Sequence, residues 1–316
     1  MVRAIPTDED DGLEPARLAP PGRGVVPGLL RIARPKQWVK NILVLAAPGA
    51  AGVLTHGGAL ARAWAAFGIF CLAASGTYFV NDTLDADADR HHPVKRHRPV
   101  AAGTVAPGLA LATGATLMAA SLGLAWWLAG HRLVIVMALY VAISTAYSIR
   151  LKHEPVIDLA GLSSGFILRA IAGGVATGVA LSNWFVIVAS FGSLLVAAGK
   201  RSAEHTKLGD DRARHRPVLA EYPETFLRFV RVLAASVTVT AYCLWAFERA
   251  ASTGKGHHPI WFELSIVPVL LAVLHLELRF ERGRGGAPEE LALQDRMLQV
   301  LGLLWVVLFA VGIYGR

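Results

Sequence analysis

The sequence predicts an all-α, polytopic membrane protein, and three observations support this fold class. Hydrophobic residues make up 54% of the 316 residues and charged residues only 17%, with a mean hydropathy of +0.47. A soluble chain of this length is normally richer in charge. Apolar runs recur along the sequence, each long enough to cross a bilayer as a helix. Basic residues gather in every second connection between these runs.

The runs divide the chain into a tail and one transmembrane domain. Residues 1–28 are expected to form a disordered polar tail, because they are rich in proline and glycine and carry an acidic stretch from Asp8 to Asp11. Residues 29–316 are expected to form a single domain. Its first run is interrupted by Pro48 and several glycines. In order, the runs predict about nine helices, at 38–56, 62–83, 107–128, 132–149, 157–178, 184–200, 228–248, 261–279 and 297–314.

The distribution of basic residues predicts the orientation in the membrane. Cytoplasmic loops carry an excess of Lys and Arg. If the N-terminal arm and every second loop are cytoplasmic, the other side holds only Arg62, Arg132, Arg249, Lys255 and Arg316. We therefore expect a cell-membrane protein with a cytoplasmic N-terminus and an external C-terminus. The net charge of +8 follows from this bias and from phosphate-binding residues, so no nucleic acid is needed to explain it.

A cluster of acids follows the second run, in the stretch NDTLDADADRHHPVKRHRPVAAG. At about 100° per residue, Asn81, Asp82, Asp85 and Asp89 fall within an arc of roughly 100°, whereas Asp87 points to the far side. Three carboxylates on one face repel one another unless a divalent cation neutralises them, and Mg²⁺ prefers oxygen ligands. The cluster therefore predicts a site for Mg²⁺ and a diphosphate. The alternative is a solvated acidic helix end, which the adjoining apolar sequence disfavours.

Other polar side chains fall on the same predicted face of the membrane. They precede the first run, end the fourth, open the fifth and close the sixth: Arg34, Lys36, Gln37, Lys40, Asn41, Tyr147, Arg150, Lys152, Asp158, Lys200, Arg201 and Glu204. Any one of these cations could be only a snorkelling anchor. Arg169 differs, because it lies about eleven residues into the fifth run. At that depth an arginine faces the bundle interior or a cavity, unless it forms a structural ion pair with another helix.

The remaining reactive residues predict no further chemistry. Cys71 and Cys243 lie inside apolar runs, where they are best interpreted as small buried side chains rather than a disulfide. His257 and His258 are expected in an external loop. The pair Asp210 and Asp211 sits in a charged loop without metal-binding spacing, which favours only a weak role.

The acidic stretch resembles the NDxxDxxxD motif of the UbiA superfamily of intramembrane prenyltransferases, whose fold agrees with the expected number of helices. The segments RPKQWVKN, LKHEPVIDLAGLSSGFILRAIAGG and GKRSAEH narrow the resemblance to a branch that serves actinobacterial cell-wall synthesis. The resemblance covers about residues 30–316. One feature departs from the general superfamily, which carries a second aspartate-rich motif near the end of the sixth helix. Lys200, Arg201 and Glu204 stand there instead and suit direct capture of phosphate.

The resemblance implies a Mg²⁺-dependent phosphoribosyltransferase with its site on the cytoplasmic side. It would transfer phosphoribose from phosphoribosyl pyrophosphate to a polyprenyl phosphate, such as decaprenyl phosphate, for arabinan precursors, and a homo-oligomer is compatible with it. Asp82, Asp85 and Asp89 would hold the metal. The other implied site residues are Asn81 and Glu204 for the metal shell or ribose hydroxyls, Lys200 and Arg201 for phosphate, Arg90, Lys95 and Arg98 in a lid loop, and Lys36, Lys40, Asn41, Tyr78, Tyr147, Lys152, Asp158 and Arg169 around the substrates.

Two other functions remain compatible with the sequence. One is an aromatic prenyltransferase that uses prenyl diphosphate, which the missing second aspartate motif disfavours. The other is a transporter or scaffold whose acids bind ions without chemistry. Transporters usually bind their substrates near the bilayer midplane, whereas the polar residues here gather at one membrane face.

Overall fold

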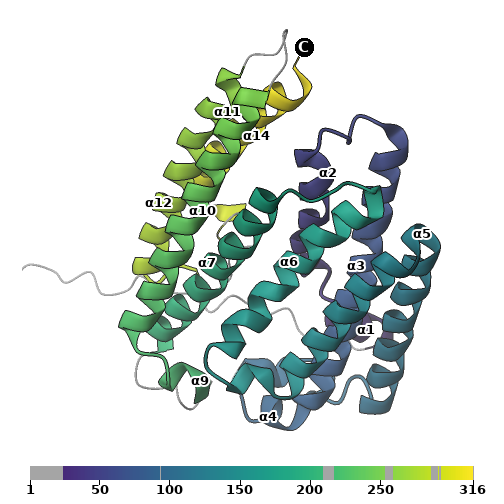
Figure 1. Cartoon of the computed structure of the whole chain (residues 1–316). Helices are drawn as coiled ribbons and strands as arrows, with labels where there is room; N and C mark the ends of the chain where they lie inside the picture. Colours follow the sequence, from purple (N-terminus) through teal and green to yellow (C-terminus); the bar gives the residue numbers. More distant parts are fainter. Residues whose placement is uncertain are drawn as a thin grey trace, which may run out of the picture.

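The computed structural model describes residues 24–92, 94–208, 217–252, 259–285, 291 and 293–315. Across these residues the chain forms helices and no strands (Figure 1). Seven stretches of helix are long and apolar enough to cross a membrane. They are α3 (Gly57–Leu84), α5 (Pro107–Ile149), α6 (Ile157–Thr177), α7 (Asn183–Leu208), α10 (Glu224–Ser252), α11 with α12 (Ile260–Leu264 and Ile266–Glu281) and α14 (Arg296–Tyr314). The predicted all-α membrane class is confirmed, whereas the predicted number of about nine helices is not.

Part of the difference in number lies in α5. This helix contains two residues with non-helical backbone angles, Ala129 and Gly130, and Gly130 has a φ of 64° that suits a residue without Cβ. The arm before this break packs on α3, where Gly114 approaches Gly76. The arm after it packs on α6, where Tyr147 lies against Gly161. The predicted runs 107–128 and 132–149 thus correspond to two helical arms that Ala129 and Gly130 separate, although α5 counts as one of the seven stretches.

The first predicted run, 38–56, does not form one regular α-helix. Its place is taken by a 3₁₀ helix, η1 (Pro35–Leu45), and a short helix, α2 (Ala46–Ala50). Proline at 48 lacks a backbone donor, which shortens any regular helix here. The backbone of η1 instead lies directly on α6, because a Cβ built at Gly173 would be 1.8 Å from the Val44 carbonyl oxygen.

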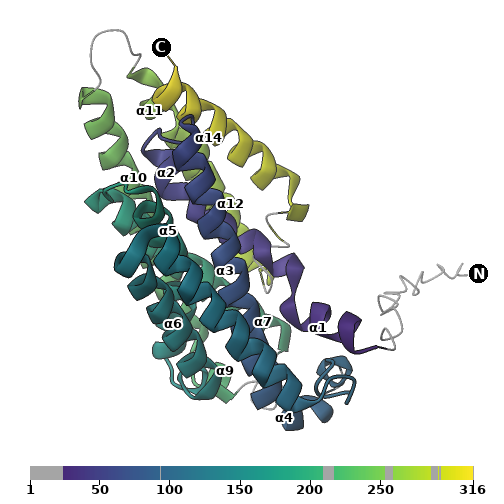
Figure 2. The same ribbon diagram turned by 90° about the vertical axis from the view of Figure 1, so that its right-hand side faces the viewer.

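A short helix, α1 (Val25–Ala33), precedes η1 and begins inside the predicted tail 1–28. Residues 1–23 of that tail, the pair Asp210 and Asp211 and the pair His257 and His258 lie outside the described residues. Two short helices, α4 (Ala86–Arg90) and α9 (Pro217–Ala220), lie at one end of the bundle, and α11 lies at the other (Figures 1 and 2). We call the first the α4 end, and it holds two of the three polar clusters described below.

A large core cluster joins α3, both arms of α5 and α6, and includes Phe70, Met137 and Tyr140. A second cluster joins the α4 end of α6, α7, α9 and α10, and includes Leu159, Leu219 and Tyr222. These two cores fix α3, α5, α6 and α7 relative to one another. They therefore set the positions of the polar side chains at the α4 end.

Candidate active site

The acids of the predicted motif lie where α3 passes into α4. Asp85 separates the two helices but keeps near-helical angles, with φ of −87° and ψ of −1°. Asp82 and Asp89 are buried, with exposed fractions of 2% and 3%. The Asp87 side chain is 90% exposed and pairs with Arg90. This burial agrees with the helical arc expected from the sequence.

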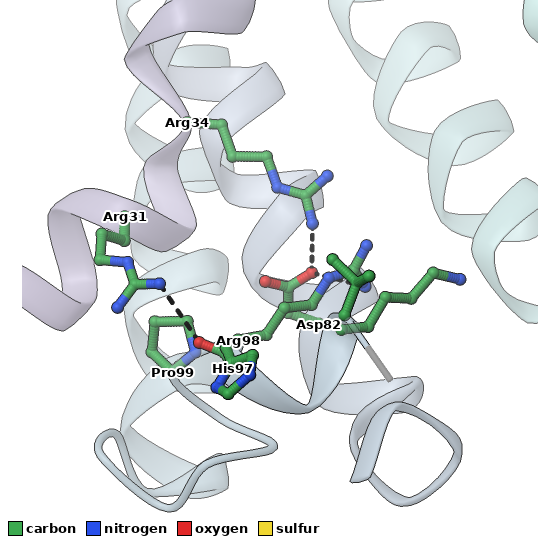
Figure 3. Close-up of a pocket in the computed structure, with 8 residues that line it drawn as sticks. Arg31, Arg34, Asp82, His97, Arg98 and Pro99 are labelled. Carbon is green, nitrogen blue, oxygen red and sulfur yellow. Dashed lines mark hydrogen bonds and ion pairs between the residues drawn. The ribbon is translucent and has the colours of Figure 1, made fainter. Parts of the chain in front are cut away.

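Two arginines neutralise the buried acids. Arg34 Nη2 lies 2.5 Å from Asp82 Oδ1 (Figure 3), and its guanidinium stacks on the ring of Tyr78 at 4.6 Å. Arg98 Nη1 lies 2.7 Å from Asp89 Oδ2 and 3.4 Å from Asp82 Oδ1. One arginine nitrogen thus bridges two carboxylates that would otherwise repel each other.

The third acid of the motif has its own partners. Lys152 Nζ lies 2.7 Å from Asp85 Oδ1, and the Asn81 amide donates to Asp85 Oδ2 at 3.1 Å. Lys152 belongs to a short 3₁₀ helix, η3 (Leu151–His153), that follows α5. The link between Asp85 and Lys152 therefore joins the acid motif to the segment that enters α6.

A cavity of about 280 Å³ opens between α1 and the loop after α4 (Figure 3). Basic side chains dominate its walls, which are formed by Arg31, Arg34, Asp82, Val94, Lys95, His97, Arg98 and Pro99. Arg31 donates to the His97 carbonyl oxygen at 3.2 Å and so holds the loop against α1. A cavity with this charge favours a phosphate-bearing ligand.

The donor set suits Mg²⁺, although no group of three or more His, Cys, Asp or Glu side chains in the described part of the chain lies close enough to hold a metal ion. Asp82, Asp85 and Asp89 supply hard carboxylate oxygens, the ligands that Mg²⁺ prefers. Asp82 and Asp89 already share one cationic group, Arg98 Nη1. A shared cation is thus accommodated between these two carboxylates, and Asp85 is one helical turn from each in sequence.

A second polar cluster surrounds Arg201, which is completely buried. Its Nε and Nη2 donate to the two oxygens of Asp158, each at 2.6 Å. Nη2 also donates to the Tyr147 hydroxyl at 2.7 Å, and Nη1 donates to Glu204 Oε2 at 2.6 Å. The Tyr147 hydroxyl in turn donates to Asp158 Oδ1 at 2.9 Å. Four hydrogen bonds thus tie Arg201 to protein groups, which favours a positioning role over the direct phosphate contact that the sequence suggested.

Arg169 forms a third cluster deeper in the bundle, with 6% of its surface exposed. Its donors reach the Asn41 side-chain oxygen at 2.7 Å, the Gly165 carbonyl oxygen at 2.6 Å and the Tyr140 hydroxyl at 3.1 Å. Its guanidinium also lies over the rings of Tyr140 and Phe70, at 5.0 and 5.5 Å. All of these partners are neutral, and they join η1, α3, α5 and α6.

One segment touches all three clusters. The second arm of α5 and η3 carry Tyr140, Tyr147 and Lys152, which contact Arg169, Arg201 and Asp85 respectively. Among the other predicted site residues, Lys36 is exposed, whereas Lys40 and Lys200 are partly buried. The hydrogen bonds of Lys152 and Arg201 therefore bring the ends of α3, α5 and α7 together with the start of α6.

Several residues that the structure places in or beside these clusters are not among the site residues that the sequence predicts. Arg34 stood out only as part of RPKQWVKN, yet it is the nearest cation to Asp82. Arg31 and His97 line the basic cavity, and Tyr140 binds Arg169. The dipeptide Arg34-Pro35 directly before an apolar run was an available signal for Arg34. Nothing in the local sequence marks Tyr140.

Comparison with known proteins identifies relatives over nearly the whole chain. The model of the UbiA prenyltransferase family matches residues 42–313. A decaprenyl-phosphate phosphoribosyltransferase of Mycolicibacterium smegmatis is 44% identical, over 94% of this chain and 95% of its own length. The enzyme of the same name from Corynebacterium glutamicum is 45% identical, over 93% of this chain and 89% of its own length.

Solved structures show the same fold at low sequence identity. A UbiA homolog from Archaeoglobus fulgidus, bound to GPP and Mg²⁺, superposes with a TM-score of 0.66 and is 18% identical, covering 90% of this chain and 98% of its own. A UbiA homolog from Aeropyrum pernix superposes with a TM-score of 0.56 and is 20% identical, covering 86% of this chain and 96% of its own.

Proposed function

The chain belongs to the UbiA prenyltransferase family, and we propose that it transfers 5-phosphoribose from phosphoribosyl pyrophosphate to a polyprenyl phosphate. The products are polyprenylphosphoryl ribose 5-phosphate and pyrophosphate. The observation that carries this proposal is the 44–45% identity, over 93–94% of the chain, to proteins named decaprenyl-phosphate phosphoribosyltransferase. Decaprenyl phosphate is accordingly the expected acceptor, and a cell-wall lipid precursor the expected product.

The residues near Arg201 support this branch of the family. The end of α7 presents Lys200, Arg201 and Glu204 rather than a second group of aspartates. Asp158 and Glu204 already neutralise Arg201. We therefore assign Arg201 to the positioning of Glu204, and Lys200 and Glu204 to the phosphate and the ribose hydroxyls of the donor.

The reaction needs charge neutralisation more than proton transfer. An oxygen of the acceptor phosphate attacks the anomeric carbon of the ribose as the bond from that carbon to the pyrophosphate oxygen breaks, and pyrophosphate leaves with the electron pair. The configuration at the carbon inverts. Because the acceptor is already an anion, no strong general base is required. Catalysis then depends on holding two anions close together and on stabilising the charge of the leaving group.

The acid motif serves the leaving group in this scheme. Asp82, Asp85 and Asp89 would hold Mg²⁺, which supplies positive charge to the departing pyrophosphate. Arg34 and Arg98, now paired with Asp82 and Asp89, lie where they can turn to phosphate oxygens once other positive charge neutralises those acids. The basic cavity beside Arg31 and Lys95 lies next to Asp82 and can take a further phosphate group.

The proposed location follows from charge and hydropathy. Seven apolar helical stretches indicate a multi-pass membrane protein. We propose that the α4 end faces the cytoplasm, because it holds the basic residues of the N-terminal arm and of the loop after α4. The soluble donor would then enter from the cytoplasm, and the C-terminus would lie outside. We also propose one transmembrane domain that can form a homo-oligomer.

Ligand-induced stabilisation tests the choice of donor. A ligand that binds only the folded protein stabilises it by about 2.7 kcal/mol at one hundred times its dissociation constant. Phosphoribosyl pyrophosphate with Mg²⁺ should therefore raise the melting temperature of the purified protein in detergent, and ribose 5-phosphate, which lacks the pyrophosphate, should raise it less. A rise with prenyl diphosphate and none with phosphoribosyl pyrophosphate would favour an aromatic prenyltransferase instead.

A further inference from the structure

The turn that opens α6 has an unusual backbone. Val156 has φ of 67° and ψ of −48°, and the N–H of Ile157 donates to the Pro155 carbonyl oxygen at 2.7 Å. This bond between residues two apart, with a positive φ at the central residue, defines a γ-turn of the rare and strained type. Positive φ is especially unfavourable for a β-branched residue such as valine. Such a turn persists only where surrounding contacts hold it in place.

The side chain of Val156 does not supply those contacts, because it is 57% exposed. The backbone does. The N–H of Val156 donates to the Tyr222 hydroxyl at 2.8 Å, across 66 residues of sequence. Tyr222 is only 2% exposed and stacks on Phe226 with the two rings nearly parallel, 5° apart. A rigid, buried phenol therefore clamps the strained turn from a different part of the chain.

The clamped turn at Val156 lies two residues before Asp158, the residue whose carboxylate holds Arg201. Asp158 is completely buried and receives two hydrogen bonds from Arg201 and one from Tyr147. Arg201 in turn holds Glu204. Val156 caps the N-terminus of α6, and Asp158 lies in the first turn of that helix. The backbone angles at Val156 therefore set where the Asp158 carboxylate points. Any relaxation of the turn at Val156 would move the Asp158 carboxylate relative to Arg201, to which it is joined by two hydrogen bonds of 2.6 Å.

Packing strengthens the same connection. Tyr222 belongs to the core cluster that contains Leu159 of α6, Ala197 and Ala198 of α7, and Leu219 of α9. Leu159 follows Asp158 directly, and Ala198 lies three residues before Arg201. The segment around Tyr222 thus touches both helices that carry the Arg201 cluster.

We propose that Tyr222 is a positioning residue of the active site, which acts through the strained turn at Val156 to align Asp158, Arg201 and Glu204 for the sugar donor. This inference rests on the proposed function, since it assigns Glu204 to the donor. Tyr222 itself touches no substrate. Its hydroxyl fixes the backbone at Val156. That backbone positions Asp158, which in turn holds Arg201 and Glu204.

The first test removes only the hydroxyl. Tyr222→Phe should lower kcat/KM for phosphoribosyl pyrophosphate by about tenfold or more, because it removes the hydrogen-bond partner of the part-buried Val156 N–H and lets the turn relax. The KM for the lipid acceptor should change by less than about twofold, as the acceptor does not use Glu204. The matched control is Tyr242→Phe. That change removes another buried hydroxyl on α10, bonded to Ser265 between α11 and α12 and to Trp305 on α14, and should leave both constants unchanged.

The second test asks whether the strained turn carries the effect. Glycine accepts a positive φ at little cost, so in a Val156→Gly background the turn depends less on the clamp. Tyr222→Phe should then reduce kcat/KM at least about threefold less than it does beside Val156, a coupling that a double-mutant cycle measures. If Tyr222 were needed only for stability, Tyr222→Phe would lower the melting temperature, and its effect on kcat/KM would be the same in both backgrounds. Equal losses in the two backgrounds would overturn the proposal, as would unchanged kinetics in Tyr222→Phe.

Failure of this inference differs from failure of the proposed function. If the wild-type protein transfers phosphoribose and Tyr222→Phe matches it, only the role of Tyr222 is wrong. If the wild-type protein neither transfers phosphoribose nor is stabilised by phosphoribosyl pyrophosphate, the function itself is wrong.

Discussion

Replacement of Arg201 by lysine separates a positioning role from direct phosphate binding. Arg201 donates four hydrogen bonds of 2.6–2.7 Å, to both oxygens of Asp158, to the Tyr147 hydroxyl and to Glu204. Lysine keeps the charge but offers one nitrogen in place of a planar fork. It cannot reach partners on three sides, so Arg201→Lys leaves at least one buried oxygen unpaired.

The structure sets the size of this effect. A hydrogen bond to a charged group contributes about 1.5–3 kcal/mol, and Arg201→Lys loses about two of the four. The cost of breaking a buried ion pair, about 3–5 kcal/mol, gives a similar figure. We therefore expect a loss of about 3 kcal/mol, because lysine keeps one contact. In a chain of 316 residues such a loss lowers the melting temperature by roughly 4–5 °C.

The assay is a thermal melt in detergent beside steady-state kinetics. The control is Arg228→Lys. Arg228 is 56% exposed and pairs with Glu281 at 3.2 Å, and exposed pairs contribute about 0–1 kcal/mol. A raised KM for phosphoribosyl pyrophosphate with an unchanged melting temperature in Arg201→Lys would refute this reasoning, because it would mean that Arg201 serves the ligand and not the fold.

Three further changes test other parts of the structure. Asp85→Asn should lower transfer by about 10²-fold or more through lost charge stabilisation at the leaving group, whereas Asp87→Asn should have little effect because that side chain is 90% exposed; equal losses in the two activity assays would contradict the helical-face argument. Arg169→Gln should lower the melting temperature, since it removes contacts that join η1, α5 and α6, and an unchanged melt would show that these contacts contribute little. Burial raises the pKa of Asp295, but hydrogen bonds from the Leu298 backbone, His275 and Arg279 outweigh it and hold that pKa at about 2, below the usual 3.8. A depressed pKa stabilises the folded state above about pH 4 and loses this effect as the pH falls toward 2, so Asp295→Ala should lower the melting temperature at pH 7 and progressively less below pH 4; a constant difference would contradict the pKa.

The sequence predicted the fold class because membrane helices leave a local signal. In a membrane, the backbone N–H and C=O groups of an apolar segment must form their hydrogen bonds within the segment itself, which makes it a helix. Hydropathy alone therefore identifies membrane helices. The errors occurred where tertiary contacts decide the outcome. The run 38–56 is apolar enough to span, yet it forms η1 and α2 because proline interrupts it and Gly173 lets its backbone lie against α6.

The candidate site shows the same division. Helical periodicity placed Asp87 on the opposite face from Asp82, and the burial of these residues agrees with it. The partners of the buried polar side chains were harder to predict from the sequence, because they come from distant segments. Arg34 lies 48 residues from Asp82, and Asn41 lies 128 residues from Arg169. No local pattern reports such pairs, which exist only once the helices have packed.

The central proposal, phosphoribosyl transfer to a lipid, is tested most directly by following the ribose. The purified protein would be incubated with Mg²⁺, polyprenyl phosphate and phosphoribosyl pyrophosphate labelled in the ribose, with the lipid product and released pyrophosphate measured in parallel. The proposal predicts ribose label in the organic phase, one pyrophosphate per labelled lipid, and no labelled lipid without the acceptor. Unlabelled lipid in this assay, together with prenylation of an aromatic acceptor from prenyl diphosphate by the same preparation, would contradict it.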